Sequence, residues 1–589
     1  MNECGGTYEY KKNQIYFIAT CCLISLSMLT KVAHAESNPI GNCYYVSSQR
    51  GSDTNSGLSI SEPFKSLNKI NELKLNPGDK VLLENGSVFE DQYLQIKNSG
   101  NIEACIEISN YGDRGNLPII NTNGKGVWYQ DYGKPLPNPW HKYKGNVSSS
   151  ILLKDVEYIK IKNIEITNDR EKSQPDHLAY NDLKVMDRTG VASVAKNKGT
   201  LENIVLENLY IHDIDGNIYN KHMANGGIYF ISELPDNEEK TGIPKYDNII
   251  IKGNRIKNVS RTGLAVAYSA YFDLFQNSAE IDQELIEKYG NTNVLIENNY
   301  IEDAGGDGIV TMYCSSPIIQ RNVSNGAGRQ MNTTDYPIVT QRVAAAMWPW
   351  KCKNALFQYN EAYSTKNADQ GNGDGQAWDA DSADGTIYQY NYSSGNSGGT
   401  VMFCLEKAVN STFRFNISQN DKKGILNLPN NPDAHIYNNI FYIDEGVPFV
   451  RKDMNTGSAL IENNIIYNAG KQPINEEWNP NNRIIHSNNL YFNYSNLPSS
   501  DNTALLVNSQ ESNIFVSPGN GPVKPNFNYL TYDRFTQNTV FDGYKLEQSS
   551  PAIHSGKKVI DKNGYNLGTD FFGIKLDDIL DIGAVKSSK

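Results

Sequence analysis

The sequence predicts an all-β protein, a single-stranded right-handed parallel β-helix with a helical N-terminal cap and loop insertions. A short segment recurs in which alternating Ile, Val and Leu residues precede a central Asn. The central residues are Asn163, Asn208, Asn254, Asn299, Asn322, Asn360, Asn391, Asn416, Asn439, Asn464 and Asn489. Their base spacing of 23 to 25 residues, lengthened in places by insertions, indicates a solenoid with one such strand per coil.

The residue pattern within each repeat favours strands over helices. Alternation with a period of two is typical of β-strands, and the lack of long helical periodicity excludes helical repeats. An Asn after the strand tolerates a left-handed bend, and stacked Asn side chains can hydrogen-bond from coil to coil. A β-propeller would need four strands in each repeat of about 40 to 50 residues, with blade signatures that this sequence lacks.

Residues 1–35 have the pattern of an export signal. A basic flank precedes an apolar run over residues 15–29, which is too short to favour a membrane-spanning helix. Ala-His-Ala at 33–35 matches a signal-peptidase site, so we expect a mature chain from Glu36 that is secreted or periplasmic and free of the membrane. An uncleaved anchor is the alternative.

The mature chain divides into three predicted parts. Residues 36–110 form an N-terminal cap and the first coils, 111–495 the β-helix, and 496–589 the C-terminal coils and cap. An amphipathic helix at about 63–73 can cover the open end of the solenoid and hide its exposed edge. The insertion at 272–291 is the clearest other helical candidate, and we expect it to form a lid or flank.

Charge and cysteine content restrict the classes of partner. The 589-residue chain has a formal net charge of −12, which excludes nucleic acid and anionic membranes as expected partners. A solenoid grows along one axis, so the length predicts one long domain, and we expect a monomer. Signal cleavage leaves five cysteines, an odd number, and Cys43 and Cys105 are the candidates for a bridge in the N-terminal cap.

Both ends of the chain resemble a known superfamily. The opening YYVSSQRGSDTNSG, followed by PFKSLNKIN and LNPGDKVLL, resembles the N-terminal cap of secreted β-helix polysaccharide lyases and hydrolases of the pectate-lyase-like superfamily. The closing SSPAIHSGKKVIDKNGYNLGTDFFG with DIGAV is similar to their C-terminal segment. The resemblance implies a β-helix that degrades a polysaccharide, but a fold does not fix a function.

Residues 341–404 combine carboxylates and indoles more densely than any other stretch. Carboxylates act as general acids, general bases or cation ligands, and indole faces suit the apolar faces of sugar rings. On one strand, Asp379 and Asp381 would share a face about 7 Å apart, a separation that suits an inverting glycosidase. Neighbouring coils can supply a further carboxylate. The predicted catalytic residues are Asp374, Asp379, Asp381 and Glu361.

Insertions lengthen the repeats most between residues 163 and 391, and insertions in solenoids commonly build the binding face. The indoles are expected to stack on sugar, an arginine to clamp a substrate carboxylate, and the charged turns before the strands to add polar contacts. The predicted substrate-binding residues are Trp348, Trp350, Trp378, Arg329, Arg261, His222 and Asp307.

The favoured hypothesis is hydrolysis of a polysaccharide by a carboxylate pair, which requires no cofactor. An alternative is a lyase that abstracts the C5 proton of a uronate and stabilises the developing charge with calcium. Its calcium ligands would be Asp379, Asp381 and Asp384, and its candidate bases Arg261, Arg329, His222, Tyr390 and Tyr392. The third hypothesis is a non-catalytic carbohydrate-binding surface protein, in which Asp and Asn residues only cap coil turns.

Overall fold

The computed structural model describes residues 41–113, 115–138, 141–170, 185–335, 342–366, 374–508, 513–525, 538–562 and 568–587. Gly41–Lys589 forms one compact unit. The predicted export signal lies outside the described residues. Among the described helices, none is both long enough and apolar enough to cross a membrane.

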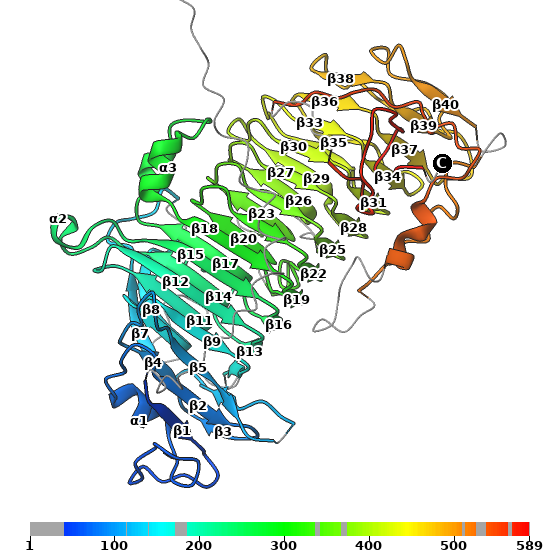
Figure 1. The fold of residues 1–589 in the computed structure, drawn as a ribbon. Coiled ribbons are helices and arrows are strands. Elements are labelled where there is room, and N and C mark those ends of the chain that lie inside the picture. The colour runs from blue at the N-terminus through cyan, green and yellow to red at the C-terminus, as the bar shows by residue number, and fades with distance from the viewer. Residues whose placement is uncertain are drawn as a thin grey trace, which may run out of the picture. The chain divides into compact units, whose positions relative to one another are not determined.

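Three long sheets run side by side along the coils (Figure 1). Successive coils pair in parallel throughout, with a single antiparallel pair, β7 with β8, among the named strands. The fold is therefore the right-handed parallel β-helix that the sequence predicts. We call the three sheets A, B and C.

Each coil of the regular part contributes one strand to each sheet. Sheet A contains β1 (Cys43–Val46), β2 (Lys80–Glu84), β5 (Ile106–Tyr111), β9 (Ile159–Lys162), β12 (Thr200–Glu207), β15 (Lys245–Lys252), β18 (Thr292–Glu297), β21 (Ile318–Gln320), β24 (Leu356–Gln358), β27 (Ile387–Gln389), β30 (Thr412–Arg414), β33 (His435–Tyr437), β36 (Ala459–Glu462) and β38 (Ile484–Ser487). Sheet B contains β3 (Val88–Glu90), β6 (Ile119–Asn121), β10 (Glu165–Asn168), β13 (Tyr210–Ile214), β16 (Arg255–Val259), β19 (Tyr300–Glu302), β22 (Val323–Asn325), β25 (Glu361–Tyr363), β28 (Tyr392–Ser394), β31 (Ile417–Gln419), β34 (Ile440–Ile443), β37 (Ile465–Asn468), β39 (Leu490–Phe492) and β40 (Leu505–Val507). Sheet C contains β4 (Leu94–Ile96), β7 (Val127–Asp131), β8 (Lys144–Lys154), β11 (Asp187–Ala195), β14 (Gly226–Ser232), β17 (Thr262–Ser269), β20 (Ile309–Met312), β23 (Met347–Trp350), β26 (Gln376–Asp381), β29 (Gly399–Cys404), β32 (Leu426–Leu428) and β35 (Val450–Asn455).

The helices are short and lie outside the sheets. They are α1 (Leu67–Glu72), α2 (Glu238–Thr241), α3 (Gln283–Tyr289) and the 3-10 helices η1 (Phe272–Phe275) and η3 (Asn538–Tyr544). Helix α1 buries Leu67 and Ile70 in the main core, which confirms the predicted helical cap. The insertion at 272–291 contains η1 and α3, as its pattern predicts. Sheet B continues to β40, beyond residue 495, and the predicted division into three parts stays a prediction.

An asparagine ladder joins the coils from Asn254 to Asn489. At each step the side-chain oxygen of one Asn accepts the backbone N–H of the Asn one coil earlier, as between Asn416 and Asn391 at 2.9 Å. The ladder ends on Asp501, which accepts from Asn489. The left-handed residue is usually the one before the ladder position, for example Phe415 at φ 52°. Asn254 begins the ladder because the equivalent positions of the two preceding coils, directly after Asn163 and Asn208, hold the apolar residues Ile164 and Leu209.

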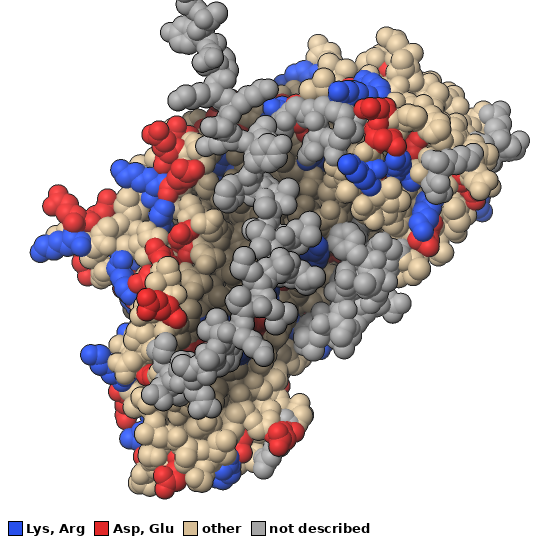
Figure 2. All heavy atoms as spheres, viewed as in Figure 1, with Lys and Arg blue, Asp and Glu red and all other residues tan. Residues whose placement is uncertain are grey.

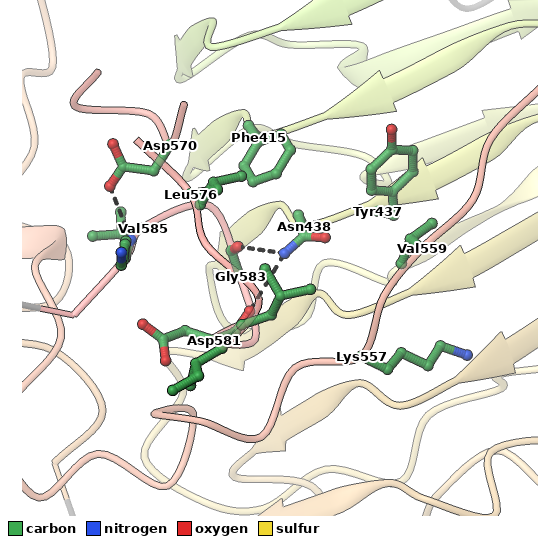
Figure 3. A pocket seen from close by; sticks show the side chains of 13 residues that line it. Phe415, Tyr437, Asn438, Lys557, Val559, Asp570, Leu576, Asp581, Gly583 and Val585 are labelled. Atoms are coloured by element: carbon green, nitrogen blue, oxygen red, sulfur yellow. Dashed lines mark hydrogen bonds between the residues drawn. The ribbon is translucent and has the colours of Figure 1, made fainter. Parts of the chain in front are cut away.

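The C-terminal segment packs against the outer face of sheet B. Tyr392 and Ile417 on that face share a buried cluster with Phe541 and Phe571 from the segment. Nearby, the Asn438 side chain donates to the carbonyl of Gly583 at 3.0 Å (Figure 3). The cavity drawn there has a volume of about 30 Å³, far below the roughly 300 Å³ or more of typical ligand pockets, so it is a packing gap rather than a sugar site.

The cysteine thiols are free among the described residues. Cys43 and Cys105 do not form the bridge considered from the sequence. The amide of Asn203 lies 3.3 Å from the Cys105 sulfur, so this thiol sits in a hydrogen-bonded rather than a cross-linked environment.

We expect the ladder to stabilise the coils. Asn416→Ala would remove the acceptor for Asn391 and the donor to the Tyr388 carbonyl, leaving buried polar groups unpaired. The free energy of unfolding should fall by about 2–4 kcal/mol, seen as a lower denaturation midpoint. Asn502→Ala at an exposed position is the control and should change it by less than about 0.5 kcal/mol. Equal midpoints for the two variants would contradict a stabilising ladder.

Candidate active site

The candidate site lies on the outer face of sheet C, on β20, β23, β26 and β29. Side chains alternate along β26, so Trp378 and Ala380 point into the main core and Asp379 and Asp381 point outward. Asp381 is in register with Trp350 on one neighbouring strand and with Cys404 on the other. Parallel stacking thus brings side chains from three coils together.

Three aspartates gather here in little contact with solvent. Asp379 is only 4% exposed, and Asp374 and Asp381 are half-buried. One oxygen of Asp379, one oxygen of Asp381 and the Cys404 sulfur all lie within 4.8 Å of one another. These carboxyl oxygens are closer than the 7 Å estimated from strand spacing, because that estimate measures the backbone and not the converging side chains.

Burial and mutual repulsion hold protons on these aspartates. Burial raises the pKa of Asp374 to about 6 and that of Asp381 to about 7, with repulsion from Asp307 adding to the first and repulsion from Asp374 to the second. Burial, then Asp381 and Asp374, raise the pKa of Asp379 well above its usual range. Neutral and ionised carboxyls therefore coexist in the site near neutral pH, which is the condition for acid–base chemistry.

Lys221 supplies positive charge to the group. Its ammonium lies 4.8 Å from the centre of the Trp348 ring, over the indole face. It favours the ionised form of all three aspartates and so lowers their pKa values against the effect of burial. Lys221 is thus placed to set how readily the carboxyls ionise.

A buried chain of polar contacts fixes Trp348. Its indole N–H donates to Asp307 at 2.9 Å, and Asp307 also accepts the backbone N–H of Ala345. Arg261 lies 3.8 Å from the same carboxylate and donates to the carbonyl of Val343. Trp348, Asp307 and Arg261, all predicted from the sequence, therefore act together as a rigid support beside Asp379.

His222 lies in the wall of the site rather than at the carboxylates. Its ring contacts His141 and Tyr268 at centroid distances of 4.3 and 4.5 Å. Burial, with His141, Lys221 and Arg261 adding repulsion, lowers the pKa of His222 well below its usual range. The imidazole is therefore neutral at physiological pH.

The structure separates several predicted residues from this group. Trp378 is wholly buried in the main core and cannot stack on a sugar, because the strand alternation turns it inward. Glu361 lies on sheet B, where it accepts from Tyr363 at 2.5 Å and is 2% exposed. Arg329 lies in a turn after β22 and donates to the carbonyl of Asp303.

Trp350, in contrast, remains at the site. It is half-buried and donates its indole N–H to Tyr313.

Asp384 does not join Asp379 and Asp381, so the predicted set of three calcium carboxylates is not brought together. Asp384 instead accepts from Lys353 at 2.9 Å and from the backbone N–H of Ile281. Burial alone would raise the pKa of Asp384, but these bonds and one from Asn410 lower it. It anchors the insertion at 272–291. The alternative bases Tyr390 and Tyr392 belong to clusters formed with the C-terminal segment.

Cys404, Lys221 and His141 were not predicted as site residues from the sequence. Cys404 follows Asp381 by 23 residues, one base repeat, so the periodicity could have identified it as a neighbour. Lys221 and His141 lie in loops whose lengths follow no repeat, and the sequence offers no comparable signal for them.

The larger groove among the described residues is a poorer candidate. It has a volume of about 350 Å³ and lies on the outer face of sheet A beside His435, Leu460 and Ile485. Asp433 alone of its described lining residues carries a carboxylate, so the groove lacks a carboxyl pair. On the face shown in Figure 2, charged side chains of both signs are interspersed among the described residues.

Comparison with known proteins gives a consistent result. A curated lacto-N-biosidase from Bifidobacterium longum subsp. longum is 46% identical over 588 residues, covering 93% of this chain and 36% of that protein. The chain thus spans about a third of the length of this curated relative. The crystal structure of a GH136 lacto-N-biosidase from Eubacterium ramulus is similar with a TM-score of 0.68 at 48% identity, covering 72% of this chain and 67% of that chain. Its selenomethionine derivative matches equally well, and no protein-family model matches the chain.

The buried aspartates should cost stability at neutral pH. Because the pKa of Asp381 is raised to about 7, folding favours its protonated form, and stability is lost as pH rises from about 4 through about 7. Asp381→Asn, which cannot ionise, should raise the free energy of unfolding by on the order of 2 kcal/mol at about pH 8, with no gain below about pH 4.

Asp384→Asn is the matched control, because the pKa of Asp384 is lowered and its ionised form stabilises the fold. This variant should be destabilised at about pH 8, and the loss should fade as the pH falls through the lowered pKa. Denaturation midpoints of both variants and the wild type, measured between about pH 4 and about pH 8, test both predictions. A loss of stability in Asp381→Asn at high pH would contradict the assignment.

Proposed function

The chain belongs to the GH136 family of lacto-N-biosidases, and on that premise we propose that it is a glycoside hydrolase that releases lacto-N-biose from glycans. Asp379 and Asp381 lie together on the outer face of sheet C, Asp374 is near enough to raise the pKa values of both, and this group of carboxyls with raised pKa values is the observation that supports this proposal most. Glycosidic hydrolysis needs two carboxyl groups, one protonated and one ionised at the same pH.

Asp374 and Asp381 are proposed as the reacting pair. Both are half-buried, so a substrate can reach them, and their pKa values of about 6 and about 7 bracket a pH range in which one is ionised and the other keeps its proton. The protonated group would donate to the glycosidic oxygen as the bond breaks. The ionised group would stabilise the developing positive charge at the sugar carbon, or attack it.

Asp379 is proposed to bind the substrate in its neutral form. It is 4% exposed, and its pKa is the most strongly raised of the three, so it stays protonated when the pair reacts. Its Oδ1 atom is buried and has no hydrogen-bond partner among the described residues, and a sugar hydroxyl would supply that partner. A protonated carboxyl can both donate and accept in such a contact.

The aromatic residues are proposed to shape the sugar site. Lys221 covers the face of Trp348, so Trp348 serves as a support for charge rather than as an open stacking surface. Trp350 is half-buried with a fixed N–H, and its position beside Asp381 suits contact with the apolar face of a sugar. The lyase hypothesis has less support, because His222 lies in the wall beside His141 and Tyr268 rather than at the carboxylates, and Tyr390 and Tyr392 lie elsewhere.

Other expectations from the sequence stay proposals. We propose that the chain is exported, because its first 35 residues have the pattern of a cleavable signal. A carbohydrate is the proposed partner, and a monomer is the proposed state. Hydrolysis by a carboxyl pair needs no cofactor, and calcium receives no role in the proposed chemistry.

Removing either reacting carboxyl should abolish most activity. Asp374→Asn and Asp381→Asn should each lower kcat on an aryl lacto-N-bioside by about 10²–10⁴-fold, because general acid or base assistance is lost. Glu361→Gln is the control and should keep its activity, since Glu361 lies on sheet B. Ultraviolet-absorbing unsaturated products, or full activity in both Asp→Asn variants, would overturn the proposal.

The pH dependence of activity should reflect the pKa values of Asp374 and Asp381. Activity should fall below about pH 6, where both carboxyls are protonated, and above about pH 7, where both are ionised. Lys221→Met should move both limbs of the kcat/KM profile to higher pH, because the cation that favours ionisation is gone. Lys221→Arg keeps the charge and should leave the limbs near their original positions. A profile that Lys221→Met does not shift would contradict this role.

A further inference from the structure

We propose that Asp379, Asp381 and Cys404 form a binding site for a thiophilic divalent cation such as zinc or cadmium, and that the bound cation inhibits the enzyme. The inhibitory consequence rests on the proposed function of Asp381. The binding site itself rests on the geometry of the three side chains alone.

Strand register builds this group. Asp381 and Cys404 face each other on adjacent strands β26 and β29, and Asp379 lies two residues earlier on the same face. One carboxylate oxygen from each aspartate and the sulfur lie within 4.8 Å of one another. Small side-chain movements bring three such atoms to the distances of about 2.0–2.3 Å at which zinc is bound.

The donor set selects the class of metal. The ligands predicted from the sequence, three carboxylates, would favour calcium, which takes six to eight oxygen atoms. In the structure, Cys404 rather than Asp384 lies beside Asp379 and Asp381. A sulfur donor favours zinc and cadmium over calcium. Two carboxylates and one thiolate leave a fourth tetrahedral position for water, as in zinc sites that exchange ligands.

An unpartnered buried atom at the site points to a ligand independently. The Oδ1 atom of Asp379 is buried and has no hydrogen-bond partner among the described residues, although the side chain is only 4% exposed. Such an atom is costly unless something binds it. Asp381 and Cys404 are half-buried, so a cation can reach the group from solvent.

Metal binding would block the proposed reaction directly. A cation on Asp381 occupies the lone pairs that this carboxyl needs to exchange a proton or to stabilise the sugar. The thiol of Cys404 and the protonated aspartates release their protons to solvent as the metal binds. A chelator would remove the metal and restore activity, because no covalent bond within the protein changes.

Cadmium titration of the full chain tests binding without reference to activity. Wild-type protein should develop the ultraviolet charge-transfer band of a cadmium–thiolate bond, zinc should compete it away, and excess calcium should not. Cys404→Ser should lose the band and weaken zinc binding, followed by calorimetry, by at least about tenfold. Cys105→Ser removes a half-buried thiol elsewhere and should keep both signals. Asp379→Asn, with its fold checked by circular dichroism, should also weaken zinc binding.

The outcomes separate this proposal from the proposed function. Asp374→Asn should lose hydrolysis yet keep the cadmium band, because Asp374 is outside the metal group. A band in a wild-type protein that cleaves no lacto-N-bioside would leave the metal site standing and refute the proposed reaction. An active protein without the band, or a band and zinc affinity unchanged in Cys404→Ser, would overturn the metal site. Zinc inhibition that is equal in wild type and folded Cys404→Ser would overturn it as well.

Discussion

Parallel register between coils is the constraint on which the rest of the structure depends. Each strand hydrogen-bonds to the equivalent strand of the next coil, so residues one repeat apart in sequence become direct neighbours in space. The asparagine ladder keeps this alignment from Asn254 to Asn489. A shift of one residue in the coil that contains β26 would turn its outer aspartates into the core and expose Trp378.

This register also explains why charge can be concentrated on sheet C. From β22 onward, the outer face of sheet B is covered by the C-terminal segment and is largely apolar. The outer face of sheet C instead meets loops, one of which places Lys221 over Trp348 and near the aspartates, with His222 beside Tyr268 in the wall of the site. The site combines a rigid strand platform with groups from loops, and the platform fixes the spacing of the carboxyls while the loops adjust their charge.

The sequence was sufficient for the fold and for placing Asp379 and Asp381 together, while their catalytic role stays a prediction. Strand alternation and the Asn spacing predict the β-helix because both follow from local geometry that every coil repeats. Asp379 and Asp381 could be placed on one face for the same reason. Glu361 could not be excluded, because which sheet is covered depends on a C-terminal segment distant in sequence. Trp378 was misplaced because density of aromatic residues says nothing of the direction in which each side chain points.

The difference between neighbours in sequence and neighbours in space also changes the set of metal ligands at the site, because Cys404 takes the place that the sequence predicted for Asp384. The sequence predicts that Asp384 lies with Asp379 and Asp381. In the structure, strand β26 ends at Asp381, and the left-handed residue Ser382, at φ 49°, turns the chain away. Asp384 then anchors the insertion, and the neighbour of Asp381 comes from the next coil as Cys404. The three aspartates of the sequence would offer only oxygen ligands, which suit calcium. The group that the coils assemble offers two carboxylates and one sulfur. In a solenoid, ligand sets are therefore to be sought at intervals of one repeat rather than within one loop.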